Sequence, residues 1–199
     1  MNLPNKLSLL RIIMIPFLVF FYLASFIPYG KVVAAVIFIL AALTDMLDGK
    51  IARKYNLITT IGKFLDSIAD KLLVTAGLIL VCFDIVPQPY GLIASIVIIC
   101  RELVVSALRQ IAAANNCILA ADMWGKVKAT VQFVAIPLFM VLAQIRDSAW
   151  LSGTAYLVFE IVGYVALGLA VLLTIMSCVH YLVHNRKVFT QEDTKKDEN

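Results

Sequence analysis

Six long apolar segments, separated by short polar breaks, set the strongest limit on how this chain can fold. A helix needs about 20 consecutive, mostly apolar residues to cross a bilayer. Of the 199 residues, 62% are hydrophobic and 15% are charged, whereas soluble domains are about 45–50% apolar and about 25% charged. We therefore predict an all-α integral membrane protein with six transmembrane helices. The segments lie roughly at residues 10–27, 32–47, 72–86, 92–112, 127–145 and 155–183.

The predicted helices occupy nearly the whole chain and leave no room for a separate soluble domain. We expect one membrane domain at residues 1–188. Residues 189–199 contain the run QEDTKKDEN, which is charged and has no apolar anchor, so we expect a disordered polar tail there. The first apolar segment has no clear cleavage site, and we expect it to be retained as a helix.

Positive charges are distributed unevenly between the two ends of the predicted helices. If the N-terminus is cytoplasmic, 15 of the 17 Lys and Arg residues fall on the cytoplasmic side, and only Lys31 and Arg146 fall on the other. Cytoplasmic segments of membrane proteins carry such an excess. We predict a multi-pass protein of the cell membrane with both termini in the cytoplasm.

Four aspartates stand within 26 residues beside two of the apolar segments, although a carboxylate at bilayer depth costs about 2.5–3.5 kcal/mol on insertion scales. Residues three or four apart share a face of a helix, so two helix ends are each expected to present a pair of carboxylates to the other. Four converging carboxylates repel unless cations lie between them. Oxygen ligands favour Mg²⁺, Mn²⁺ or Ca²⁺ over zinc, and paired ions recur in phosphoryl chemistry. The aspartates are Asp45, Asp48, Asp66 and Asp70.

Small residues on the same helix faces would let a ligand or a neighbouring helix approach closely; they are Gly49, Ala52 and Gly62. The alternative interpretation is a solvated helix–loop–helix in which the acids pair with nearby cations. Those cations are Lys50, Arg53, Lys63 and Lys71.

The complete pattern is D-x-x-D-G-x-x-A-R, then eight residues, then G-x-x-x-D-x-x-x-D, at residues 45–53 and 62–70. It resembles the signature of the CDP-alcohol phosphatidyltransferase family. The resemblance implies six transmembrane helices, a homodimer and a cytoplasm-facing polar active-site cavity that holds two divalent ions, Mg²⁺ or Mn²⁺. The four aspartates would bind the ions, and Asp70 would also be the base for the acceptor hydroxyl. The CDP-donor pocket would include Asn5, Ser8, Gly49, Ala52, Arg53 and Gly62.

Three further stretches, MNLPNKLSLLRIIMIP, RELVVSALRQIAAANN and WGKVKATVQ, resemble the bacterial branch of this family that makes phosphatidylglycerol phosphate. Ala129 departs from that branch, which usually has Thr directly after the lysine. The resemblance implies transfer of a phosphatidyl group from CDP-diacylglycerol to glycerol 3-phosphate, with release of CMP. Basic side chains on the predicted cytoplasmic side suit a phosphorylated acceptor. They are Arg101, Arg109, Lys126 and Lys128.

Other acceptors within the family remain alternatives: inositol phosphate, serine or a cardiolipin-type acceptor. A divalent-cation transporter is an alternative of another class, but it should carry polar residues through the membrane midplane, where this sequence is apolar. We expect membrane lipids and no nucleic acid as partners. For Glu160 the sequence leaves open a pairing with Arg146 or a place at a subunit contact, and it assigns no role to Glu160, His180 or His184.

Overall fold

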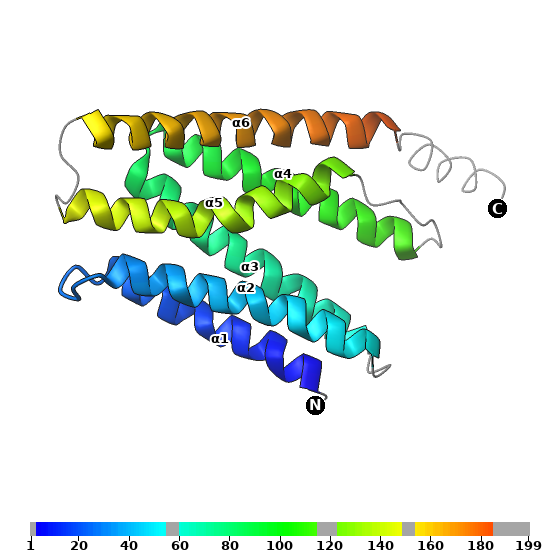
Figure 1. Ribbon diagram of the computed structural model, residues 1–199. Helices are drawn as coiled ribbons and strands as arrows, with labels where there is room; N and C mark the ends of the chain where they lie inside the picture. Colours follow the sequence, from blue (N-terminus) through cyan, green and yellow to red (C-terminus); the bar gives the residue numbers. More distant parts are fainter. Residues whose placement is uncertain (1–2, 55–59, 115–122, 149–153, 185–199) are drawn as a thin grey trace, which may run out of the picture.

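The computed structural model describes residues 3–54, 60–114, 123–148 and 154–184. These residues form helices, with short turns after the first helix and after the third, which confirms the all-helical prediction for the described part of the chain. The helices lie side by side in an elongated bundle (Figure 1). Their bounds are α1 (Leu3–Leu23), α2 (Gly30–Lys54), α3 (Thr60–Ile85), α4 (Tyr90–Ala114), α5 (Met123–Asp147) and α6 (Thr154–His184).

Four of the described helices contain a stretch long and apolar enough to cross a membrane. These stretches are Asn5–Leu23, Tyr90–Leu108, Ala129–Asp147 and Glu160–Val179. They support a multi-pass membrane protein, while the count of six spans stays a prediction. α1 begins and α6 ends at the same end of the bundle (Figure 1).

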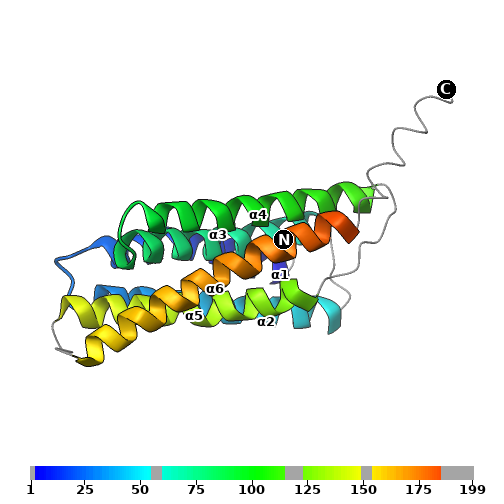
Figure 2. The ribbon, with the colours of Figure 1, turned by 90° about the horizontal axis from the view of Figure 1, so that it is seen from above.

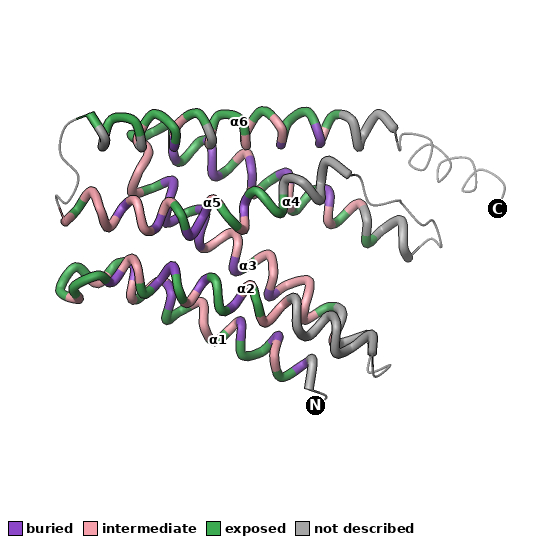
Figure 3. The backbone as a smooth tube through the Cα atoms, in the orientation of Figure 1, coloured by how far each residue is buried: buried purple, intermediate pink, exposed green. Residues whose placement is uncertain are grey.

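Exposed positions alternate with buried ones along the helices (Figure 3), and many of the exposed residues are large and apolar. Phe17 is 56% exposed and Val134 is 64% exposed. Monomeric soluble proteins rarely expose large contiguous apolar surfaces, because water solvates them poorly. The surface of this bundle instead suits the hydrocarbon of a bilayer.

α1 packs against both α2 and α3, and α5 packs against the other side of the same two helices. α4 lies on α3, and α6 lies on α4 and α5 (Figures 1 and 2). A Cβ atom at Gly77 would lie 2.7 Å from Ile136 Cγ2 and 2.9 Å from a ring carbon of Phe38, so glycine allows α2, α3 and α5 to meet closely. The buried core includes Leu18, Phe38, Leu73, Ile98 and Met140.

Five polar side chains join α1, α2, α3 and α5 at the end of the bundle where α3 and α5 end. We call them the Asp84 cluster: Tyr22, Lys31, Asp84, Arg146 and Asp147. Arg146 Nη2 lies 2.7 Å from Asp84 Oδ1 and 3.2 Å from Asp147 Oδ1, and Nη1 donates to the Asp84 carbonyl oxygen at 2.7 Å. Lys31 bridges the same two carboxylates, and the Tyr22 hydroxyl donates to Asp84 Oδ2 at 3.0 Å.

Loss of the central carboxylate should destabilise the bundle. We expect Asp84→Asn to lower the free energy of unfolding by about 1–3 kcal/mol, because Lys31 and Arg146 lose a shared anion while they remain partly buried. Thermal unfolding in detergent measures the change. Asp147→Asn is the matched control and should have a smaller effect, since this side chain is 41% exposed and Asp84 is 23% exposed. An unfolding midpoint unchanged by Asp84→Asn would contradict a stabilising cluster.

Glu160 has a different partner from the one that the sequence suggested. Its Oε1 accepts a hydrogen bond from the Tyr164 hydroxyl at 2.7 Å, while Arg146 is engaged in the Asp84 cluster. The pairing of Glu160 with Arg146 is therefore not found among the described contacts. The side chains of His180 and His184 lie outside the described residues.

Candidate functional site

Three helices bring Arg11, Asp45 and Asp66 together about two turns inside the end of the bundle where α2 ends and α3 begins. Arg11 Nη1 lies 2.7 Å from Asp45 Oδ1 and 3.4 Å from Asp66 Oδ1. Both carboxylates thus approach the same guanidinium nitrogen. One carboxylate from α2 and one from α3 therefore converge, as the spacing of the aspartates predicts.

Arg11 is the central residue that the sequence-based list of site residues did not include. Its side chain is 0% exposed, and Nε donates a hydrogen bond to the Ala41 carbonyl oxygen at 3.2 Å. A buried guanidinium is costly unless close anions and hydrogen bonds offset its lost hydration. The signal was present in the sequence, because a charge inside an apolar segment marks a functional site by default.

Asp70 follows Asp66 by one turn on the polar first part of α3, before the apolar stretch that begins at residue 72. Burial, together with the nearby charge of Asp45, raises the pKa of Asp70 to about 6, against the opposing effect of Lys71. A cation near this carboxyl group would favour its ionised form. Asp70 thus belongs electrostatically to the same acidic group as Asp45.

The residues expected to bind the CDP donor are described only in part. Asn5 and Ser8 are 9% and 2% exposed on α1, and Gly62 lies one turn before Asp66 on α3. Within the described part of the chain, Asn5 Oδ1 has no hydrogen-bond donor, so this buried oxygen can accept a bond from a ligand. The surroundings of four predicted positions of α2 are not among those that the structure describes: Asp48, Gly49, Ala52 and Arg53.

Arg101 is the one described member of the basic group expected at the acceptor phosphate. It is 8% exposed on α4, where Nη2 donates to the hydroxyl oxygen of Ser177 on α6 and Nη1 lies 3.8 Å from Glu102 Oε1. Nε has no partner among the described residues. Ser177 is a contact that the sequence did not reveal, since the last helix reads as generically apolar. The side chains of Arg109, Lys126 and Lys128 lie outside the described residues.

The converging carboxylates have the chemistry that a hard divalent cation requires. Mg²⁺ prefers oxygen ligands, often one or two carboxylates together with substrate phosphates. Asp45 and Asp66 supply such oxygens from two helices, and Asp70 adds a third acid nearby. The described side chains alone contain no complete group of three metal-binding residues. The residues present nevertheless fit Mg²⁺ or Mn²⁺ by ligand type.

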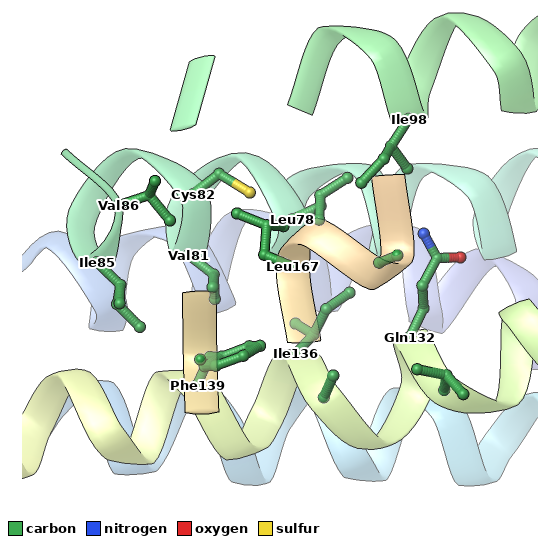
Figure 4. A pocket seen from close by; sticks show the side chains of 14 residues that line it. Leu78, Val81, Cys82, Ile85, Val86, Ile98, Gln132, Ile136, Phe139 and Leu167 are labelled. Carbon is green, nitrogen blue, oxygen red and sulfur yellow. The ribbon is translucent and has the colours of Figure 1, made fainter. Parts of the chain in front are cut away.

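A separate apolar cavity of about 50 Å³ lies between α3, α4, α5 and α6 (Figure 4). Gln132 is its polar lining residue, and Nε2 of this buried side chain has no partner within the described residues. The volume suits one or two water molecules and is too small for a nucleotide or a lipid headgroup. The cavity is therefore not part of the acidic site.

A membrane bundle with paired acids on two adjacent helices defines the class of protein, and comparison with known sequences identifies it. The chain belongs to the CDP-alcohol phosphatidyltransferase family, whose model matches residues 1–176. This range includes the four aspartates, Arg11 and all the predicted basic residues.

Several bacterial proteins named CDP-diacylglycerol–glycerol-3-phosphate 3-phosphatidyltransferase are similar over most of their length. The protein of Bacillus subtilis (strain 168) is 39% identical, with 92% of this chain and 95% of the relative covered. That of Salmonella choleraesuis (strain SC-B67) is 36% identical, with 91% and 93% covered. That of Rickettsia bellii (strain RML369-C) is 34% identical, with 94% and 97% covered.

Proposed function

We propose that this protein transfers a phosphatidyl group from CDP-diacylglycerol to sn-glycerol 3-phosphate, giving phosphatidylglycerol phosphate and CMP. The observation that carries the proposal is the similarity, over 92% of the chain, to a relative named for this reaction. The convergence of Asp45 and Asp66 supports it, because paired acids on adjacent helices suit metal-assisted phosphoryl chemistry.

In the proposed mechanism, the four aspartates Asp45, Asp48, Asp66 and Asp70 hold two divalent ions, Mg²⁺ or Mn²⁺. Such ions, when bound, neutralise the donor pyrophosphate and stabilise the charge on departing CMP. Asp70 takes the proton of the acceptor hydroxyl. The hydroxyl oxygen bonds to the β-phosphorus, and the bond from that phosphorus to CMP breaks. Asn5 and Ser8 from α1 contact the donor, together with Gly49, Ala52, Arg53 and Gly62.

The acceptor phosphate is bound, in this proposal, by Arg101, Arg109, Lys126 and Lys128. Arg101 supports this assignment because its buried guanidinium is held by Ser177 and keeps Nε unpaired within the described residues. A guanidinium presents several donors in one plane and suits a phosphate group. These contacts would orient the acceptor hydroxyl toward the donor phosphorus.

Loss of a basic residue from the acceptor site should weaken acceptor binding more than turnover. We expect Lys126→Ala to raise the KM for glycerol 3-phosphate by about tenfold, because one close charge on a phosphate contributes on the order of 1–2 kcal/mol. Steady-state CMP release at varied acceptor concentration measures it. Lys195→Ala removes the same charge from the predicted tail and should leave KM unchanged. An unaltered KM in Lys126→Ala would move the phosphate site elsewhere.

We further propose that all six helices cross the cell membrane, that both termini and the acidic site face the cytoplasm, and that the protein is a homodimer. The uneven distribution of Lys and Arg supports the orientation. We also propose that residues 1–188 form one membrane domain and that residues 189–199 form a polar tail.

The test uses purified protein in detergent with CDP-diacylglycerol. CMP release is followed with glycerol 3-phosphate, inositol phosphate, serine or phosphatidylglycerol as acceptor, and the lipid product is identified by mass. We expect release with glycerol 3-phosphate alone. CMP release with another acceptor would support the assignment as a phosphatidyltransferase but overturn glycerol 3-phosphate as its acceptor. No CMP release with any acceptor, in folded protein, would overturn the assignment as a phosphatidyltransferase.

A further inference from the structure

We propose that Arg11 is a built-in counter-cation of the acidic site, which holds Asp45 and Asp66 together when no divalent ion is bound. The inference rests on the metal site of the proposed function and concerns a positioning residue. Arg11 is completely buried, and its Nη1 lies 2.7 Å from one carboxylate and 3.4 Å from the other. One guanidinium nitrogen therefore lies between an acid of α2 and an acid of α3.

A backbone hydrogen bond also fixes the position of Arg11. Nε donates to the carbonyl oxygen of Ala41, one turn before Asp45 on α2. α1 packs against both α2 and α3, so a side chain from α1 can reach both acids at once. The guanidinium is thus held by a helix backbone through Nε while Nη1 contacts both carboxylates.

A charge argument explains why such a residue is needed. Asp45 and Asp66 both approach one nitrogen of Arg11, and two carboxylates so close together repel strongly when no cation is near. Divalent ions supply the missing positive charge once they bind. Arg11 supplies it beforehand, so the protein need not depend on metal to keep α2 and α3 in register. Removal of its charge should therefore make folding stability more dependent on divalent ions.

The Asp84 cluster provides a matched comparison at the other end of the bundle. Arg146 also contacts two aspartates through one nitrogen, Nη2, and donates to a backbone carbonyl through another. This cluster is not part of the proposed metal site. Arg146→Gln therefore controls for the loss of an arginine shared by two carboxylates.

The experiment measures the thermal unfolding midpoint of the full-length protein in detergent, in EDTA and at increasing Mn²⁺ concentration, without turnover. We expect Arg11→Gln to lower the midpoint in EDTA and to show a Mn²⁺-induced rise roughly twice that of the unsubstituted protein. Arg11→Lys keeps the charge and should show the same Mn²⁺-induced rise in the unfolding midpoint as the unsubstituted protein. Arg146→Gln should lower the midpoint with and without Mn²⁺ and leave the rise unchanged.

A Mn²⁺-induced rise in Arg11→Gln that equals the rise in the unsubstituted protein or in Arg11→Lys would overturn the inference. If Arg11→Gln does not fold, Arg11→Gln/Asp66→Asn decides the question. If this double variant folds in EDTA, the result supports the role of the Arg11 charge. If it does not fold, that role is overturned. If Mn²⁺ leaves every midpoint unchanged, including that of the unsubstituted protein, the metal site of the proposed function fails as well.

Discussion

Replacement of Asp70 by asparagine should lower kcat by about 10²–10⁴-fold, the range typical for loss of a general base. The amide cannot accept the proton of the acceptor hydroxyl, and it is a weaker ligand for a divalent ion. The fold should survive, because Asp70 lies near Asp45 and the substitution removes a repulsion between them. We therefore expect the unfolding midpoint of Asp70→Asn in EDTA to equal or exceed that of the unsubstituted protein.

CMP release and thermal unfolding together test this prediction. Asp147→Asn removes a carboxylate at the other end of the bundle and should leave kcat within about twofold, since the change lies away from the chemistry. Turnover of Asp70→Asn close to that of the unsubstituted protein would remove Asp70 from the role of base. A loss of turnover that accompanies a loss of folding would instead assign Asp70 a structural role.

Removal of divalent ions should have the other large effect, a fall in CMP release of more than about 10³-fold. The reason is electrostatic: without ions, the converging acids face a donor pyrophosphate of the same sign, and nothing neutralises charge on departing CMP. Dialysis against EDTA followed by a discontinuous CMP assay measures the loss. Added Mg²⁺ or Mn²⁺ should restore activity.

The control for this experiment is EDTA already saturated with Mg²⁺, which contains the chelator but cannot remove metal. It should leave activity intact. Full activity after exhaustive chelation, with metal content verified by elemental analysis, would contradict a metal-dependent reaction. It would also leave Asp45 and Asp66 without a role beyond their pairing with Arg11.

The helices were predictable from the sequence because apolar segments of spanning length are a strong signal, but their limits were less accurate. The first apolar segment runs to Ile27, whereas α1 ends at Leu23 and a turn follows. Hydropathy cannot detect this end, since the turn itself contains Phe26 and Ile27. In that turn Tyr29 has a φ of 61°, a local conformation that no average over apolar residues can reveal.

The convergence of acids was also predictable, because spacings of three and four residues fix a common helix face. The sequence marked Arg11 as an unusual charge, but its partners were not predictable, since spacing within α2 and α3 does not say which third helix packs beside them. The same limit applies to Arg101, whose partner Ser177 is 76 residues away in sequence. Contacts between helices depend on the packing of the whole bundle, which a periodic pattern within one helix does not encode.

The burial of Arg11 has a consequence for how the chain enters the membrane during synthesis. A lone arginine at the centre of an inserting helix costs about 2.5–3.5 kcal/mol, and Arg11, about two turns from the start of α1, carries part of this penalty until an anion reaches it. Asp45 is 34 residues later in the chain, on the next helix, and Asp66 is on the one after that. We infer that the charge of Arg11 is compensated only once α2 has been made, so the packing of α1 cannot be completed before α2 joins it.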